Sequence, residues 1–352
     1  MRWSIIQEAD QSSSTNEERY HEVIEEVALA DRLGFHAYGT SEQHFFPPRF
    51  TVSAPEVLYA AIAMRTENIK LRPMIVVPMT WHHPILIAER LASLDIVSRG
   101  RVELATGRGN NLNTMKVFGI DPSETREIYA EAMDAVEAIL DNPDEVEHHG
   151  KYWDFQKTTV VPQMMGQRFP NLSMAASSVE SHGVAADRGY GVISFENYFG
   201  FDFLQECIDT YRKTITQTAA APHKVNDYVG LCVGTAFCAS TTERARELSG
   251  AEAIKYLKTT LEVYKPMANQ PGYTYMDRIN TLIDKQDDLD WLCEETSVVM
   301  VGTPDDFIRR GKKLEAMGVE EIILRIDGLP HGDIMESIEL IGREVIPAFD
   351  ND

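Results

Sequence analysis

The sequence predicts an α/β protein, a single (β/α)8 TIM barrel domain over residues 1–352. Short apolar runs rich in β-branched residues alternate with longer segments whose apolar residues recur every three or four positions, which is typical of strands that are each followed by a helix with one buried face. The length of 352 residues is ordinary for such a barrel with insertions. We therefore expect ligands to bind at the carboxyl ends of the strands.

One stretch gives the clearest strand and helix signals. Residues 69–78 form an apolar run closed by prolines, which predicts a strand buried on both faces. Pro84 suits the first position of a helix over residues 85–97, and Ser98-Arg99-Gly100 ends that helix. A strand over residues 101–105 leads into Thr106-Gly107-Arg108-Gly109, where two glycines permit a tight turn and Arg108 is available to an anion.

The remaining elements follow the same alternation. Further strands are predicted at residues 3–7, 35–39, 172–176, 191–195, 229–238 and 321–326, with a short apolar stretch at 298–301. Helices are predicted at residues 17–33, 55–65, 122–140, 179–187, 201–216, from about 243 onward, 304–317 and 334–345. Two insertions interrupt the pattern, a hairpin at about 145–161 and a polar loop at about 266–295.

Composition excludes several classes of function. With 33 basic and 55 acidic residues the formal net charge is −22, so nucleic acid and anionic membranes are not expected partners. The chain has no apolar run of about 18 residues, and its first residues enter a strand without a signal-peptide pattern. Four cysteines show no metal-ligand spacing. These observations predict a cytoplasmic protein with reduced cysteines and no metal site.

Polar residues that follow the predicted strands are the candidates for a functional site. Glu42, Gln43 and His44 follow the second strand, and Ser177 and Ser178 precede a helix, where hydroxyls and backbone N–H groups can bind an anion or simply cap the helix. His44 is either a structural loop histidine or a group that exchanges protons. His82 and His83 are adjacent on a turn and point apart, which disfavours a metal site.

Several short motifs occur in a characteristic order and spacing. They are Ser41-Glu-Gln-His-Phe45, Trp81-His-His-Pro84, Thr106-Gly-Arg-Gly109, Phe118-Gly-Ile-Asp121 and Val301-Gly-Thr-Pro-Asp305. From the first strand to the last helix, the sequence resembles the bacterial-luciferase-like flavin monooxygenases. The resemblance implies a barrel that binds reduced FMN from a separate flavin reductase and reacts it with O2 to a peroxyflavin that oxygenates an organic substrate. It also implies a homodimer formed through the second and third helices.

The resemblance assigns residues to the flavin. Arg108, Arg126 and Ser177 would hold its phosphate, and a non-prolyl cis peptide at Met74–Ile75 would lie against its ring. The complete set of expected cofactor-binding residues is Met74, Ile75, Gly107, Arg108, Asn111, Arg126, Ala176, Ser177, Ser178 and Ser194.

The sequence departs from the family at one position of the expected catalytic group, Glu42, Gln43 and His44. The family commonly has Glu-His-His after the second strand, and here Gln43 replaces the first histidine. Because glutamine does not titrate, either His44 performs the proton chemistry or the reaction requires only a hydrogen bond from Gln43.

Three alternatives to a monooxygenase remain. The first is a deazaflavin (F420)-dependent dehydrogenase or reductase, which would transfer hydride and avoid oxygen. The second is a flavin-binding protein without catalysis. A hydrolase using Glu42 and Asp95 is disfavoured because Asp95 falls inside a predicted helix.

Aromatic and sulfur side chains near the strand ends indicate a small apolar substrate; they are Phe45, Phe46, Met79, Trp81, Phe195 and Phe199.

Overall fold

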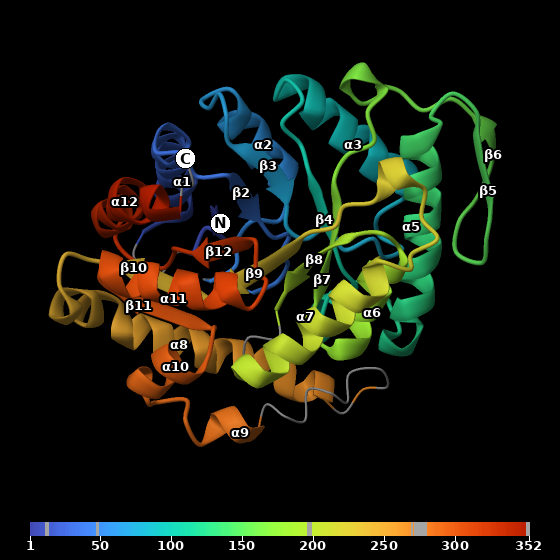
Figure 1. The fold of residues 1–352 in the computed structure, drawn as a ribbon. Coiled ribbons are helices and arrows are strands. Elements are labelled where there is room, and N and C mark those ends of the chain that lie inside the picture. Colours follow the sequence, from blue (N-terminus) through green and yellow to red (C-terminus); the bar gives the residue numbers. More distant parts are fainter. Residues whose placement is uncertain (11–13, 47–48, 196–198, 269, 271–279, 350–352) are drawn as a thin grey trace.

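The predicted barrel is present in the computed structural model, which describes residues 1–10, 14–46, 49–195, 199–268, 270 and 280–349 (Figure 1). Its parallel strands have the order β3-β2-β1-β12-β9-β8-β7-β4, and the bridges Leu71–Val102 and Val76–Thr106 join β3 to β4 and close the barrel. The strands are β1 (Arg2–Ile6), β2 (Ala37–Thr40), β3 (Lys70–Pro73), β4 (Leu104–Thr106), β7 (Leu172–Ala176), β8 (Gly191–Ser194), β9 (Val229–Val233) and β12 (Glu321–Arg325).

Helices surround the barrel, and their ends follow local sequence signals. Thr15 forms a capping box with Glu18 at the start of α1, and Pro84 occupies the first turn of α3 as expected. The predicted helices appear as α1 (Asn16–Arg32), α2 (Pro55–Ala63), α3 (Pro84–Val97), α5 (Thr125–Asp141), α6 (Val179–Asp187), α7 (Phe201–Ile215), α8 (Thr242–Ala268), α11 (Pro304–Ala316) and α12 (His331–Leu340). A π-helical turn, Ile341–Val345, continues α12.

The predicted hairpin is confirmed as β5 (Val146–His149) and β6 (Asp154–Thr158), which project beside α5 (Figure 1). The carboxylate of Glu131 on α5 accepts hydrogen bonds at 2.9 Å from the backbone N–H groups of Lys151, Tyr152 and Trp153. A Cβ at Gly150 would lie 2.1 Å from Glu131 Oε1, so this close approach requires glycine. The Glu131 carboxylate therefore holds the turn of the hairpin against α5.

The prediction of a loop at residues 266–295 is wrong for the part that the structure describes. Helix α8 extends to Ala268, and α9 (Asn280–Ile283) and α10 (Leu289–Glu295) follow; residues 269 and 271–279 lie outside the described residues. Leu257 and Leu261 of α8 are buried in one cluster with Leu282 and Leu292. Contacts among apolar residues distant in sequence therefore order this segment. The segment is polar on average, so its composition did not indicate these contacts.

Two further differences arise near the barrel mouth. The predicted strand at residues 229–238 breaks at Gly234, after which β10 (Thr235–Cys238) leaves the barrel and pairs in parallel with β11 (Val299–Gly302). The expected loop after Gly109 contains the short helix α4 (Leu112–Val117), whose first N–H groups bind the Asn111 side chain. Both changes place additional structure around the carboxyl ends of the strands.

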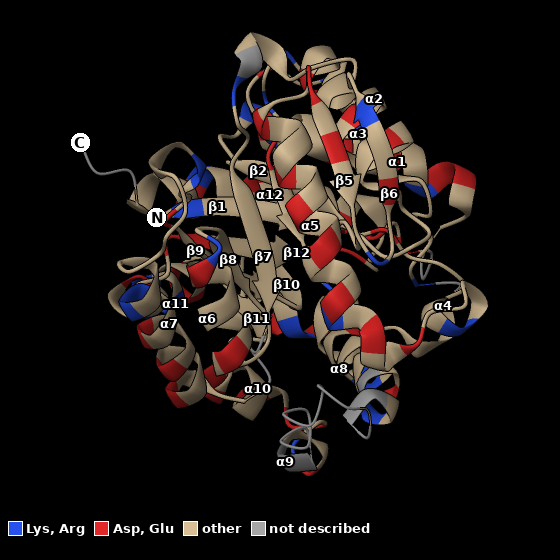
Figure 2. Ribbon diagram, turned by 90° about the vertical axis from the view of Figure 1, so that its right-hand side faces the viewer, with Lys and Arg blue, Asp and Glu red and all other residues tan. Residues whose placement is uncertain are grey.

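The charged residues at the surface and the state of the cysteines agree with what the sequence predicted. Acidic residues recur along α5 in Figure 2, where basic residues are scattered. All four cysteines are free and buried. Among the described residues, no helix combines the length and apolar character needed to cross a membrane.

Candidate functional site

A cavity of about 190 Å³ opens at the carboxyl ends of the barrel strands. Each of the eight barrel strands, or the loop directly after it, contributes to the lining, as expected for a ligand site in this fold. The predicted residues that line it are Gln43, Met74, Ile75, Gly107, Arg108, Asn111, Ser177 and Phe195. These residues therefore lie together in the wall of one cavity, at the end of the barrel where the sequence predicted a ligand site.

The apolar wall of the cavity is formed where β3 and β4 end. The peptide bond between Met74 and Ile75 is cis, as the family resemblance implied. A Cβ on Gly107 would come within 2.6 Å of Ile75 Cδ1, and Gly109 has φ of +73°. Gly107 is therefore needed for the turn to pass this closely behind Ile75, and Gly109 allows the left-handed backbone conformation of the turn.

Another part of the cavity is suited to an anion. Arg108, Ser177 and Ser181 line it at the start of α6, where the helix dipole and backbone N–H groups favour negative charge. The hydroxyl oxygen of Ser181 accepts hydrogen bonds from the N–H groups of Ser177 and Ser178 at 3.1 and 3.0 Å. Ser178 itself caps α6 and does not line the cavity, which corrects its expected role as a direct ligand.

Arg126 does not line the cavity. Its guanidinium donates two hydrogen bonds, of 2.6 and 2.9 Å, to the carboxylate of Glu180 in the first turn of α6. These bonds, with the charge of nearby Arg108, hold the pKa of Glu180 below its ordinary value. The expected phosphate ligand thus forms an exposed ion pair at the edge of the same region.

Ser194 and Ala176 face away from the cavity, which corrects the expectation that they line it. Successive side chains of a strand point to opposite faces, so Phe195 points inward and Ser194 outward, and Ala176 likewise lies outside the lining to which Ala175 contributes. Ser194 Oγ lies 2.7 Å from Nε2 of buried His182, whose Nδ1 lies 2.8 Å from the Ser178 carbonyl oxygen. Burial lowers the pKa of His182 to about 4, so this histidine is a neutral structural group.

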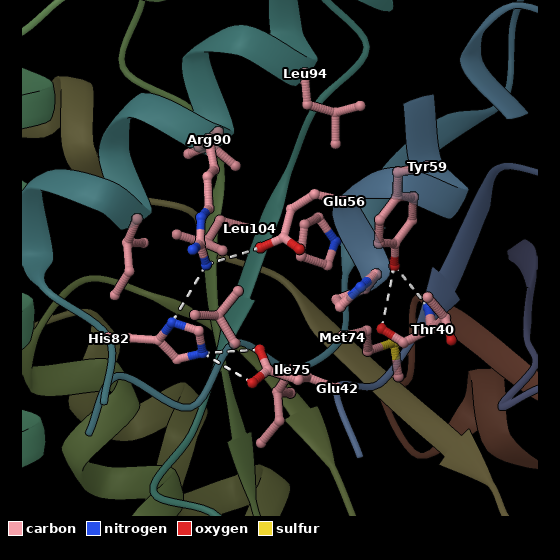
Figure 3. Close-up of a pocket in the computed structure, with 15 residues that line it drawn as sticks. Thr40, Glu42, Glu56, Tyr59, Met74, Ile75, His82, Arg90, Leu94 and Leu104 are labelled. Carbon is pink, nitrogen blue, oxygen red and sulfur yellow. Dashed lines mark hydrogen bonds and ion pairs between the residues drawn. The ribbon is translucent and has the colours of Figure 1, made fainter. Parts of the chain in front are cut away.

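The three predicted catalytic residues do not line one common cavity. Gln43 lines the main cavity, whereas Glu42 lines a side cavity of about 30 Å³ between β2, β3, α2 and α3 (Figure 3). Glu42 lies 2.7 Å from His44 Nε2 and 2.8 Å from His82 Nε2. The side cavity holds little more than one water molecule, so it is too small for a cofactor.

The Glu42 cluster extends to the outer helices. Arg90 Nη1 on α3 lies 3.3 Å from His82 Nδ1 and 3.3 Å from Glu56 on α2 (Figure 3). Since Arg90 can only donate, Nδ1 of His82 accepts and its Nε2 carries the proton donated to Glu42. Burial would raise the pKa of Glu42, but the hydrogen bonds from His82 and His44 hold it below its ordinary value. Glu42 is therefore an ionised anchor for two histidines.

His44 does not line the main cavity. Its ring contacts Phe118 edge-on at 5.2 Å, and Phe118 stacks on Trp81 at 5.0 Å. Met79 is buried in the core outside the barrel, and of the six residues expected to form an apolar pocket, only Phe195 is among the described lining residues. The structure thus gives Gln43, rather than His44, access to a ligand.

Several lining residues were missed by sequence reasoning; they include Glu8, Ser41, Phe50, Cys232, Tyr256, Thr260 and Arg325. Glu8 and Arg325 lie at the ends of the first and last strands, where the barrel rule that selected Gln43 also applies. Tyr256 and Thr260 come from α8, and nothing in their local sequence indicates that this helix covers the barrel mouth.

The fold and the cavity define a (β/α)8 barrel enzyme whose site combines an anion-binding region with an apolar wall. The profile of the luciferase-like monooxygenases matches residues 1–321, and the chain belongs to that family. The protein is accordingly an oxidoreductase.

Comparisons with individual proteins agree. The chain is 26% identical over 339 residues to limonene 1,2-monooxygenase of Rhodococcus erythropolis, covering 94% of this chain and 82% of that protein. It is 26% identical over 368 residues to the oxygenase component of a flavin-dependent trigonelline monooxygenase of Acinetobacter baylyi, covering 99% and 96%. These relatives cover nearly the whole length of the chain.

Solved structures share the fold. The oxygenating constituent of 3,6-diketocamphane monooxygenase of Pseudomonas putida, in complex with FMN, has a TM-score of 0.76 at 22% identity, covering 99% of this chain and 98% of that one. An F420-dependent secondary alcohol dehydrogenase has a TM-score of 0.75 at 16% identity, covering 99% of both chains. The barrel is therefore shared by proteins named for different flavin-type cofactors.

Proposed function

We propose that this protein is the oxygenase component of a two-component monooxygenase, which uses reduced FMN and O2 to oxygenate a small, largely apolar organic molecule. The observation that carries the proposal is the main cavity, whose lining joins an anion-binding region at Arg108, Ser177 and Ser181 to an apolar wall at Met74, Ile75 and Gly107. A flavin mononucleotide has the matching chemistry, a phosphate at one end and a flat ring system at the other.

Each part of the cavity has a role in this proposal. Arg108 and the α6 N-terminus bind the phosphate, and Met74, Ile75 and Gly107 contact the ring. When bound, reduced FMN supplies the two electrons with which one atom of O2 enters the substrate and the other leaves as water. Gln43 donates a hydrogen bond at the reacting edge, and the surrounding side chains exclude bulk water.

A separate flavin reductase is the proposed partner that supplies reduced FMN. The trigonelline relative is named as an oxygenase component, which supports the same division of labour here. The cytoplasmic location remains a prediction, and so does the route by which oxygen is activated.

Rapid mixing tests the function directly. The protein is mixed anaerobically with reduced FMN and then with O2, and oxygen consumption and flavin absorbance are followed with and without candidate substrates. Substrate-dependent oxygen incorporation supports a monooxygenase. Reduced F420 that is oxidised by hydride transfer without oxygen uptake would instead identify a deazaflavin enzyme, and FMN binding without turnover a non-catalytic flavoprotein.

Removing the arginine at the anion-binding region should weaken FMN binding. We expect Arg108→Ala to lower affinity by about 1.5–3 kcal/mol, the range for a hydrogen bond to a charged group. The dissociation constant is measured by fluorescence titration. Arg126→Ala is the comparison variant, and it should have a smaller effect because Arg126 is bound by Glu180. Equal affinity of the wild type and Arg108→Ala would exclude Arg108 from phosphate binding.

The homodimer is proposed to form through α2 and α3, which lie side by side in Figure 1. Large apolar side chains are exposed on or next to these helices; Val57 is 71% and Met64 73% exposed, and Leu86, Ile96 and Val97 are also exposed. We expect Val57→Asp with Leu86→Asp to produce monomers in sedimentation velocity. Val184→Asp on α6 is the control and should leave the mass unchanged. A monomeric wild type would contradict the proposed dimer.

A further inference from the structure

The main cavity contains a charged donor that no group of the described residues satisfies. Arg325, at the end of β12, is 2% exposed and lines the cavity. Its Nε donates to Glu8 at 2.9 Å and its Nη2 to Asp10 at 3.1 Å, while Nη1 is buried and has no hydrogen-bond partner in the part of the chain that the structure describes. Unsatisfied buried donors of this kind are costly, so this one points to a bound acceptor.

The position of Arg325 is fixed by its neighbours. Its guanidinium carbon lies 3.8 Å from the centre of the Tyr256 ring, which covers one face. Glu8 in turn accepts a hydrogen bond from Ser41 Oγ at 2.9 Å. Glu8, Ser41, Tyr256 and Arg325 all line the cavity, so a ligand that fills it meets a pre-positioned polar group at this end, here called the Arg325 end.

The charges around the Arg325 end disfavour an anion. Asp10 also binds Arg49 at 2.9 Å, and Asp327 binds Arg19 at 3.2 Å. The ion pairs that connect to Arg325 contain three carboxylates and two guanidiniums; they are Glu8, Asp10 and Glu252, and Arg49 and Arg325. Burial raises the pKa of Glu8, although Arg325 partly opposes that rise. An added carboxylate would therefore increase an existing excess of negative charge.

We propose that Arg325 selects substrates that carry a neutral oxygen acceptor, a ketone or hydroxyl oxygen, and that the Arg325 end discriminates against carboxylates. The inference rests on the proposed function, and it refines the expected apolar substrate to an apolar skeleton with one oxygen. A hydrocarbon of the same shape would displace solvent from Nη1 without replacing its hydrogen bond. The ketone should consequently bind about tenfold to a hundredfold more tightly than the hydrocarbon.

Matched ligands test the inference with the wild-type protein loaded with oxidised FMN. The probes are methylcyclohexane, cyclohexanone, cyclohexanol and cyclohexanecarboxylate, with the corresponding two-ring decalin series. Binding is measured by headspace partitioning for hydrocarbons and by calorimetry for the others. The ketone or alcohol should bind most tightly in the ring size that fits. Hydrocarbon affinity within twofold of the ketone, a carboxylate that binds most tightly, or no binding by any probe would each overturn the inference.

Two variants test whether the ligand preference arises at the Arg325 end. Arg325→Lys keeps a cation beside Glu8 and Asp10 but removes the Nη1 donor, so the preference for the ketone should largely disappear. Glu8→Gln removes one negative charge, so carboxylate binding should strengthen by about tenfold while ketone binding changes little. Arg309→Lys, an exposed arginine paired with Glu294, is the matched control and should retain the preference. An unchanged ketone preference in Arg325→Lys would overturn the assignment.

Separate measurements test the proposed function and the proposed role of Arg325. FMN titration is measured first, and absence of FMN binding contradicts the proposed function. The probe series can then be repeated on the flavin-free protein, because Arg325, Glu8 and Tyr256 hold one another in place without a cofactor.

Discussion

Gln43→Ala should lower the rate of substrate oxygenation by about 10²–10³-fold, the range for loss of one positioned hydrogen-bond donor at a reacting centre. The physical reason is that Gln43 lines the same cavity as Met74 and Ile75, which are proposed to contact the flavin ring. FMN affinity should change little, since the amide is not expected to contact the phosphate. Single-turnover kinetics with reduced FMN and O2 would measure the chemical step, and fluorescence titration would measure the affinity.

His44→Ala is the matched comparison. The ring of His44 lies against Phe118 and its Nε2 lies 2.7 Å from Glu42, so we expect it to position the loop, with less than about a tenfold loss of rate. Gln43→His should introduce a titration near pH 6.5, the ordinary imidazole pKa. A loss of 10²–10⁴-fold in His44→Ala, with a flattened pH profile, would instead establish His44 as the general acid or base.

Arg72→Met should destabilise the barrel by about 3–5 kcal/mol, the cost of leaving buried carboxylates without their cation. Arg72 lies at the end of the barrel opposite the cavity. It binds Glu103 at 2.7 Å and Glu321 at 2.8 Å, and all three side chains are largely buried. Urea unfolding measures the change. Arg2→Met is the control and should cost less than about 1 kcal/mol, because Arg2 is 39% exposed and 3.9 Å from Glu321.

The cost of Arg72→Met should depend on pH. Burial would raise the pKa of Glu321, but Arg72 lowers it to about 2. A depressed pKa contributes stability that is present above the unfolded value, near 4.5, and is lost as the pH falls towards 2. Without Arg72 the pKa of Glu321 rises, so the variant is penalised most at neutral pH and less at pH 5. A destabilisation that is equal at pH 5 and 7 would contradict this account.

Local sequence signals determined the barrel and the end of it at which the main cavity opens. Pro84 and the glycine-rich turn at Gly107 each act through neighbours within a few residues, and the structure confirms both. The hairpin around Gly150 and the cis peptide at Met74–Ile75 were also placed correctly. Repeated apolar spacing is a local property, so it was sufficient for the strands and helices, whereas the cis peptide was implied by the resemblance to the family.

Tertiary structure decided which polar residues reach the cavity. The one-residue alternation of β8 turns Phe195 inward and Ser194 outward, a distinction that an approximate strand boundary cannot provide. Arg126 donates a hydrogen bond to Glu180, 54 residues away in the sequence, and Arg325 donates one to Glu8, 317 residues away. Likewise, Leu282 and Leu292 order the segment after α8 by packing against that helix. The Arg325–Glu8 pairing depends on the closure of the barrel, which places the first and last strands side by side. Local periodicity predicts none of these contacts between residues distant in sequence.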